Sequence, residues 1–264
     1  MNHTFEQLFL RNPDRDENGI FYFNTDSDGD YFTDTDIRDW RTVWFQNNWK
    51  KRVLLENPAS YHLISAIIEA GSPVIDLACG PGMGLLPSIK QIDSSFPCMA
   101  TDANSLVVRE WKRYLDDQEN YDALDFAQFS ALDMPIKSGT IQAYSSFIGI
   151  SSTHRGDAGY RLALSEIHRT LSDEGRLYTI ENEWSDIPAI LDLFEKMNRQ
   201  PWSVFGEKQI SWHDRFIESG FEIVSEQQYE YRSLQGKDNE LGKAALEFGV
   251  DIGMNLTAYI VKKK

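Results

Sequence analysis

The chain has 264 residues, an apolar fraction of 41% and a formal net charge of −15. This charge excludes nucleic acid as the main partner, because affinity for nucleic acid depends on clustered Lys and Arg side chains that neutralise phosphates. No window approaches the run of about 18 apolar residues that a membrane span needs, so we expect no membrane partner, and the N-terminus lacks the pattern of a secretory signal.

Two cysteines, Cys79 and Cys98, are too few to indicate a disulfide framework. Both fall in or beside predicted strands, so we interpret them as small buried hydrophobes of a protein in the reducing cytoplasm. The length fits one large domain, or one domain with an extension, that forms a monomer or a homodimer.

The first 58 residues are predicted to form an N-terminal extension and helical cover. Residues 1–35 look irregular and acidic, and residues 24–29 resemble half of a calcium loop, although position 12 of that loop is Thr35. We interpret this stretch as a solvated turn and predict no metal site. From Asp36 to Leu55 the pattern is helical, with Trp40, Val43, Trp44 and Phe45 near one face.

A second helix is predicted over residues 59–70, with Leu63, Ile64, Ile67 and Ile68 facing inward. Gly71 ends this helix, and Pro73 follows. A predicted domain over residues 59–264 begins with this helix.

Residues 74–82 read VIDLACGPG, and a helical pattern follows from Leu85. This order predicts a strand, a tight turn and a helix. Asp76 lies where an open α/β sheet binds its ligands, at the carboxyl end of a strand. The dinucleotide fingerprint G-x-G-x-x-G does not fit, because its third glycine would fall on Leu85 or Pro87.

A second strand is predicted to end at Asp102, a little beyond the distance of about 20 residues at which an acid commonly holds ribose hydroxyls. Asp102 could instead cap the helix that begins near Ala103. In a third segment, Asp133 precedes Pro135 and could be a turn residue. Residues 141–152 are predicted to be a buried fourth strand that opens into a loop.

The remainder of the chain completes a sheet. A helix over residues 160–171, with apolar positions that include Leu162, is followed by a predicted turn at residues 173–175 and a fifth strand over residues 176–181. Two further helices are predicted over residues 187–197 and 212–219. Strands are predicted over residues 221–225 and 256–261, with a helical insertion over residues 241–249 between them.

These four ordered segments resemble the class I S-adenosylmethionine-dependent methyltransferases, in particular the methyltransferase type 11-like, small-molecule branch. Asp76, Gly80 and Gly82 match the first motif of that family, and Ala78 departs from it where the family usually has glycine. The resemblance covers roughly residues 72–181. It implies a doubly wound, Rossmann-like α/β fold with a seven-stranded sheet, mostly parallel with an antiparallel last strand, plus the N-terminal helical extension.

The resemblance also implies S-adenosyl-L-methionine as the cofactor and assigns roles to residues. The methionine amino group would lie near Asp76, the ribose near Asp102 and Ala103, and the adenine near Leu132, Asp133 and the backbone amide of Met134. The methyl group would lie beside the end of the fourth strand. The cofactor-binding residues implied are Asp76, Ala78, Gly80, Gly82, Asp102, Ala103, Leu132, Asp133, Met134, Ser145, Ser146 and Phe147.

The predicted function is therefore methyl transfer to a small-molecule acceptor. The motifs by which nucleic-acid methyltransferases are recognised are missing after the fourth strand, where the chain reads SSFI. His154, in the following loop, is the candidate general base, or else a surface histidine. Two alternatives stay open, which are a cofactor-binding regulatory protein without turnover and an NAD-type oxidoreductase.

Overall fold

The computed structural model describes residues 5–23, 33–47, 54–118, 122–153, 155–201 and 210–264. The predicted solvated turn at residues 24–29, which resembles half of a calcium loop, and the candidate base His154 lie outside these residues. The side chains of Trp40, Val43, Trp44 and Phe45 also lie outside the description.

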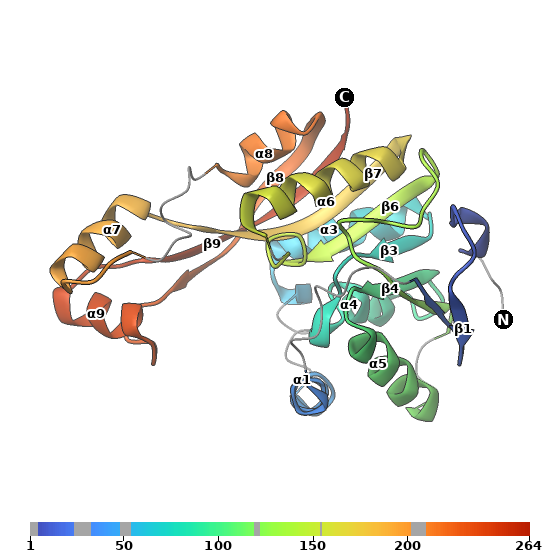
Figure 1. The fold of residues 1–264 in the computed structure, drawn as a ribbon, viewed down its shortest axis with the longest axis horizontal. Helices are drawn as coiled ribbons and strands as arrows, with labels where there is room; N and C mark the ends of the chain where they lie inside the picture. The colour runs from blue at the N-terminus through green and yellow to red at the C-terminus, as the bar shows by residue number, and fades with distance from the viewer. Residues whose placement is uncertain (1–4, 24–32, 48–53, 119–121, 154, 202–209) are drawn as a thin grey trace.

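The described residues contain nine strands in a single sheet, in the order β1-β2-β5-β4-β3-β6-β7-β9-β8 (Figure 1). The strands are β1 (Arg15–Glu17), β2 (Ile20–Tyr22), β3 (Val74–Asp76), β4 (Cys98–Asp102), β5 (Leu124–Gln128), β6 (Ile141–Phe147), β7 (Leu171–Trp184), β8 (Phe221–Ser233) and β9 (Gly253–Lys263). The helices are η1 (Glu6–Leu8), α1 (Asp34–Asn47), α3 (Pro58–Ala70), η2 (Gly80–Gly82), α4 (Leu86–Ile92), α5 (Ser105–Gln118), α6 (Gly156–Thr170), α7 (Ile187–Lys196), α8 (Trp212–Glu218) and α9 (Glu240–Phe248).

The predicted Rossmann-like architecture is confirmed. Strands β2, β5, β4, β3, β6 and β7 pair in parallel, and β9 pairs antiparallel with both β7 and β8. The sheet exceeds the seven predicted strands because β1 and β2 add a hairpin beside β5. The prediction that residues 1–35 are irregular is wrong for these two strands.

Helices cover both faces of the sheet, as the alternation of side chains along buried strands requires. One face carries the buried side chains of α3, α4 and α5 together with Cys98 and Ala100 of β4. The opposite face carries those of α6 and α8 together with Met99 of the same strand. The molecule is thus a three-layer α/β/α sandwich whose strand ends at the carboxyl edge form the floor of any ligand site.

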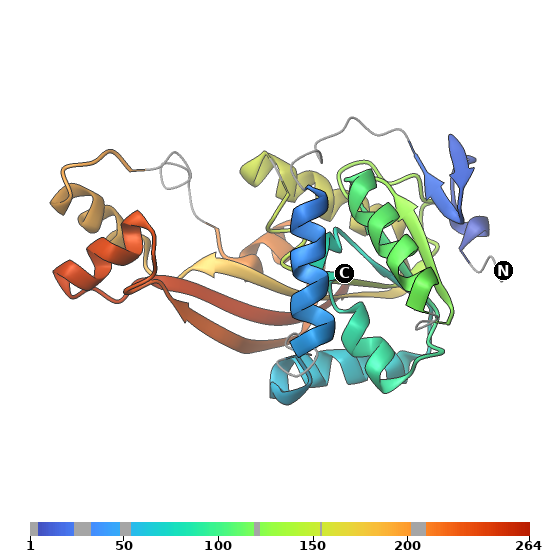
Figure 2. The same cartoon turned by 90° about the horizontal axis from the view of Figure 1, so that it is seen from below.

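Strands β7, β8 and β9 continue beyond the body of the sheet and carry α7 and α9 at their far end (Figures 1 and 2). These two helices share a small apolar core of their own, which includes Ile190, Phe194, Leu241 and Ile252. None of the helices in the described ranges is long and apolar enough to span a bilayer.

The prediction of a turn at residues 173–175 is wrong. Helix α6 ends at Thr170, and β7 begins at once with Leu171 and includes these residues. A Cβ on Gly175 would lie 2.5 Å from the main-chain oxygen of Ile141. Glycine here permits close approach of two strands, and the register between β6 and β7 shifts at this point. Leu162, predicted on the apolar side of the helix, is 44% exposed.

Asn57 anchors the start of α3 to the sheet. Its Oδ1 accepts from the backbone N–H of Ala59 at 3.0 Å, and its Nδ2 donates to the main-chain oxygen of Tyr229 on β8 at 2.7 Å. Asn239 caps α9 by one bond, from the N–H of Gly242 at 2.8 Å.

We expect Asn57→Ala to lower the free energy of unfolding by about 2 kcal/mol, because it removes both a helix cap and a tertiary hydrogen bond. Asn239→Ala, which removes the cap alone, should cost about 1 kcal/mol. Urea denaturation followed by circular dichroism gives both values. An equal loss in the two variants would mean that the bond to β8 contributes nothing.

Candidate functional site

The glycine-rich turn after β3 is held between the two neighbouring strands. The N–H of Leu77 donates to the main-chain oxygen of Ser145 on β6, and the N–H of Cys79 donates to that of Thr101 on β4, both at 2.8 Å. Ala78, between them, has a φ of 49°, and Gly80 has a φ of 59°. The predicted tight turn is present, with alanine in the left-handed region at the position where the family usually has glycine.

Asp76 is fully buried and faces the interior of the turn. Its Oδ2 accepts from the hydroxyl of Ser145 at 2.6 Å and from the N–H of Leu85 at 3.2 Å. A Cβ on Gly84 would lie 1.9 Å from Oδ1 of the same carboxylate, so glycine is required there. The Asp76 carboxylate therefore fastens the start of α4 and the end of β6 to one point.

Asp102, at the end of β4, lies directly against the turn. Its Oδ2 accepts from the N–H of Gly80 at 2.8 Å, and its Oδ1 accepts from the N–H of Asn104 at 2.8 Å. Burial raises the pKa of Asp102 to about 6, although the two N–H donors act in the opposite direction. The structure thus brings together the acid and the glycine turn that the sequence analysis assigned to one ligand.

Gln128 extends this edge onto β5, where it pairs in register with Asp102. Its Nε2 donates to the main-chain oxygen of Ala103 at 2.9 Å. Gln128 is not among the predicted site residues, although a polar residue at the end of an otherwise apolar strand is a signal that could have found it.

The third predicted segment, which contains Asp133 and Pro135, is held by hydrogen bonds to Ser130. The Ser130 hydroxyl accepts from the N–H of Leu132 at 3.1 Å, and its main-chain oxygen accepts from the N–H of Asp133 at 3.2 Å. Asp133 is exposed. The N–H of Met134 donates to Glu166 Oε2 on α6 at 2.9 Å, so this amide is already hydrogen-bonded. The structure does not gather these residues as closely as it does Gly80 and Asp102.

The end of β6 carries a hydroxyl and an aromatic ring. Ser146 is fully buried, and its Oγ has no hydrogen-bond partner among the described residues. Phe147 meets the ring of Tyr229 edge to face, with centroids 6.2 Å apart. Within the described ranges, Asn104 Nδ2 and the Tyr229 hydroxyl are likewise buried without a partner. Buried polar atoms without a partner are rare in native interiors. Ser146 and Asn104 lie at the ends of β6 and β4, and Tyr229, on β8, meets Phe147 at the end of β6.

Helix α1 lies across this region, beside α5 and in contact with η2 (Figure 2). Its start is capped reciprocally, since the hydroxyl of Thr33 accepts from the N–H of Asp36 and the Asp36 carboxylate accepts from the N–H of Thr33. Ile37 is fully buried. The helix thus covers the outside of the glycine turn.

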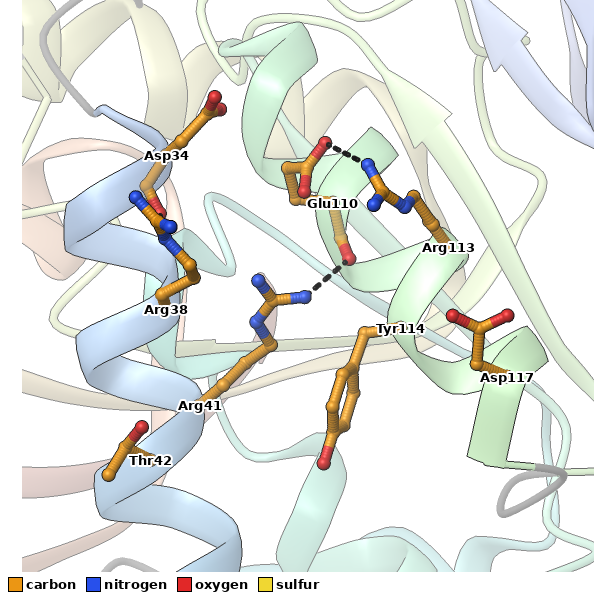
Figure 3. A pocket seen from close by; sticks show the side chains of 8 residues that line it. All are labelled: Asp34, Arg38, Arg41, Thr42, Glu110, Arg113, Tyr114 and Asp117. Atoms are coloured by element: carbon orange, nitrogen blue, oxygen red, sulfur yellow. Dashed lines mark hydrogen bonds and ion pairs between the residues drawn. The ribbon is translucent and has the colours of Figure 1, made fainter.

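A polar groove of about 680 Å³ separates α1 from α5 (Figure 3). Arg41 of α1 bridges it by donating to the main-chain oxygen of Glu110 at 3.4 Å, and its guanidinium lies 5.0 Å from the ring centroid of Tyr114. The acids and bases that line the groove are equal in number, so the groove has no excess charge to attract a charged ligand. We therefore interpret the groove as the surface along which α1 docks on α5. The lining residues are Asp34, Arg38, Arg41, Thr42, Glu110, Arg113, Tyr114 and Asp117.

We expect Ala78→Gly to stabilise the protein by about 1 kcal/mol, because a left-handed conformation costs an L-residue roughly that amount and costs glycine little. For a chain of this size the melting temperature should rise by about 2–4 °C. Differential scanning fluorimetry measures the shift. Ala100→Gly, in the buried middle of β4, is the control and should lower the melting temperature. A lower value for Ala78→Gly would contradict the expectation.

Comparison with known proteins agrees with this fold and motif order. The profile of the ubiE/COQ5 methyltransferase family matches residues 60–208. The chain is 25% identical over 139 residues to the ubiquinone/menaquinone biosynthesis C-methyltransferase UbiE of Rhizobium johnstonii, an alignment that covers 53% of this chain and 52% of that protein. The chain thus spans about half the length of the curated relative that it matches.

Solved structures share the fold at low sequence identity. The MccD protein superposes with a TM-score of 0.55 at 18% identity, over 79% of this chain and 99% of that one. The PH0226 protein of Pyrococcus horikoshii OT3 superposes with a TM-score of 0.54 at 14% identity, over 86% of this chain and 99% of that one. A geranyl diphosphate methyltransferase in complex with GPP and sinefungin gives 0.52 at 12% identity, over 78% and 79%.

Proposed function

Because the chain belongs to the ubiE/COQ5 methyltransferase family, we propose that it transfers a methyl group from S-adenosyl-L-methionine to a small-molecule acceptor. The observation that carries the proposal is the contact between Gly80 N and Asp102 Oδ2, at 2.8 Å. It joins a close-approach turn to a carboxylate that can accept from two vicinal hydroxyls.

The residues at the carboxyl edge fit this cofactor chemically. Asp102 would accept from the ribose hydroxyls, and Gly80 and Gly82 would let the backbone approach the ligand. The buried amide of Asn104 and the buried hydroxyl of Ser146 lack partners within the described chain, and polar atoms of a bound ligand would satisfy them. Leu132, Asp133 and Met134 are proposed for the adenine, with Ser130 holding the backbone of the first two and Glu166 that of Met134.

When bound, S-adenosylmethionine supplies a methyl group that its sulfonium has already activated. The contribution of the chain is then position and the exclusion of water. Asp76 and Ser145 fix the turn from below, Ser146 and Phe147 are proposed to adjoin the methyl group, and α1 covers the turn from outside.

The acceptor is proposed to lie beside Phe147 and Tyr229, which form an aromatic wall at the end of β6. The alignment with a C-methyltransferase supports a carbon atom as the acceptor. Both cysteines are buried, and small buried thiols support the reducing cytoplasm as the proposed compartment.

Isothermal titration calorimetry with S-adenosylhomocysteine and with NAD tests the proposal. We expect binding of S-adenosylhomocysteine alone. Binding of NAD alone would favour the oxidoreductase alternative and overturn the proposal. Incubation with S-adenosylmethionine labelled on its methyl group and a panel of metabolites then tests turnover, since a purely regulatory protein would bind the cofactor and label none of them.

A further inference from the structure

Glu181 is a buried carboxylate that the proposed reaction does not yet use. It lies on β7 and is fully buried. Its Oε2 accepts from the N–H of Ser151 at 2.9 Å, and its Oε1 accepts from the hydroxyl of Thr179 at 2.5 Å. Ser151 belongs to the turn that follows β6, so Glu181 connects β7 to that turn.

The turn at residues 148–151 has a strained backbone. Ile148 has a φ of 60°, a conformation that β-branched residues rarely adopt. Such a conformation persists only when its surroundings over-determine it. Here the N–H of Ile148 donates to the main-chain oxygen of Ile180 at 2.7 Å. The bond from Ser151 to Glu181 fixes the other end of the turn.

The same turn rests on the glycine-rich turn after β3. A Cβ on Gly149 would lie 2.6 Å from the main-chain oxygen of Leu77, 2.6 Å from the hydroxyl of Ser146 and 3.0 Å from the main-chain oxygen of Ala78. Only a glycine can occupy this position without displacing one turn from the other. A displacement of residues 148–151 would therefore be transmitted directly to residues 77 and 78.

We propose that Glu181 is a positioning residue for the cofactor, whose carboxylate holds the turn at residues 148–151 against the glycine-rich turn. The proposal rests on the proposed function, because it assigns these two turns to the methionine end of S-adenosylmethionine. It adds a residue that touches neither cofactor nor acceptor and acts through the backbone of Ser151.

A carboxylate suits this role better than a neutral group. Hydrogen bonds from a backbone N–H to an ionised acceptor are roughly twice as strong as those to a neutral one. The groups that face Glu181 are neutral, namely Thr179 on its own strand, the backbone and hydroxyl of Ser151, and the amide of Ile150. Tyr259 of β9, which pairs with Thr179, is a titratable group that interacts with Glu181, and burial holds the pKa of Tyr259 above the ordinary value.

Glu183, two residues further along β7, provides a matched control. Its Oε2 also accepts from a backbone N–H, that of Trp212, at 3.1 Å, and burial raises its pKa as well. However, Trp212 begins α8 and meets the turn after β6 indirectly, through Tyr160, whose ring packs against that of Trp212 and whose hydroxyl donates to the main-chain oxygen of Ser151 at 3.2 Å. Glu181→Gln and Glu183→Gln therefore each weaken one carboxylate–amide bond, and only the first bond lies beside the proposed site.

The test measures the dissociation constant of S-adenosylhomocysteine and the melting temperature for the wild type and both variants. We expect Glu181→Gln to weaken binding about tenfold or more, the equivalent of one charged hydrogen bond, and Glu183→Gln to change it less than about twofold. Equal effects of the two variants, or unchanged binding by Glu181→Gln, would overturn the positioning role. A wild type that does not bind S-adenosylhomocysteine would instead reject the proposed function itself.

Binding by the wild type at several pH values is a second readout that needs no folded variant. Burial raises the pKa of Glu181 to about 7, so its bond to Ser151 should weaken, and the dissociation constant should rise, as the pH falls through 7. Asp102 titrates nearer pH 6 and contributes a separate change below it. Affinity that is constant between pH 8 and pH 6.5 would contradict the proposal.

Discussion

Replacement of Lys90 by methionine is expected to lower the free energy of unfolding by about 3 kcal/mol or more. Lys90 lies on α4 and is only 3% exposed. Its ammonium group donates to the main-chain oxygens of Phe96 at 2.6 Å, Asp122 at 2.5 Å and Ser94 at 3.1 Å. One side chain thus ties together the segments that lead into β4 and β5.

Two effects of this substitution oppose each other. Burial of the ammonium group is costly and lowers the pKa of Lys90, so removal of the charge returns some free energy. However, the acceptors are backbone carbonyls, which a substitution cannot make apolar. The carbonyl of Phe96 loses its donor in a buried place, and those of Asp122 and Ser94 lose theirs in partly buried ones. We expect the loss of these bonds to outweigh the relief, because several acceptors depend on a single donor.

Urea denaturation followed by circular dichroism measures the effect. Lys112→Met is the matched control, because Lys112 also lies on a helix but forms a surface pair with Asp116 at 2.5 Å. Exposed pairs of this kind contribute about 0.5 kcal/mol. A Lys90→Met variant that unfolds at the same urea concentration as Lys112→Met would show that water or a rearranged loop replaces the ammonium group.

Asp102→Asn should reduce the affinity for S-adenosylhomocysteine about 100-fold. Two hydrogen bonds from ribose hydroxyls to a charged acceptor are worth about 3 kcal/mol together, and about 1.4 kcal/mol corresponds to a factor of ten. An amide also presents N–H groups toward Gly80 N or Asn104 N, where the carboxylate accepts in the native protein. Calorimetric titration measures the loss.

Asp93→Asn is the control for this substitution. The Asp93 carboxylate accepts from the N–H of Ser95 at 2.9 Å, in the exposed loop before β4, at the opposite edge of the sheet. Its replacement should leave the affinity unchanged. If Asp102→Asn binds S-adenosylhomocysteine as the wild type does, the ribose assignment is wrong.

The same residue should make stability depend on pH in a defined direction. Burial raises the pKa of Asp102 from 3.8 to about 6 in the folded protein, so the folded state binds more protons than the unfolded state between these values. The contribution of Asp102 to stability therefore falls as the pH rises through this window. The stability of Asp102→Asn relative to the wild type should rise by up to about 3 kcal/mol between pH 4 and pH 7, as melting at both pH values would show. Loss of affinity without loss of stability at neutral pH would mark Asp102 as a residue kept for binding.

The sequence predicted the part of the site that is built from local patterns. Gly80 and Asp102 follow buried strands directly, and parallel strands bring their carboxyl ends to one edge, so their proximity could be inferred. Glu181 could not be found in this way, because its partner Ser151 is 30 residues distant and neither residue belongs to a recognisable motif. Gly84 and Gly149 were missed for the same reason, since their importance lies in the atoms that approach them.

Prediction of the fold was limited in the same way, to elements that local sequence signals define. The helix predicted over residues 59–70 is confirmed as α3, because its apolar spacing and Gly71 are both local signals. Strand β1 was missed, because its sequence, Arg15-Asp16-Glu17, has the composition of a loop. Pairing with β2 makes these residues a strand, and that pairing is a tertiary contact which propensity does not record.

The hairpin of β1 and β2 has a consequence for how the protein tolerates shortening. Without it, β5 would become the border of the sheet, and its unpaired backbone groups would offer a template for aggregation. With it, the border is a strand of three residues, all of them charged, which is a poor template for further strands. Removal of the first 23 residues should therefore yield a protein that self-associates. The removed segment lies at the opposite end of the sheet from α7 and α9 (Figure 1).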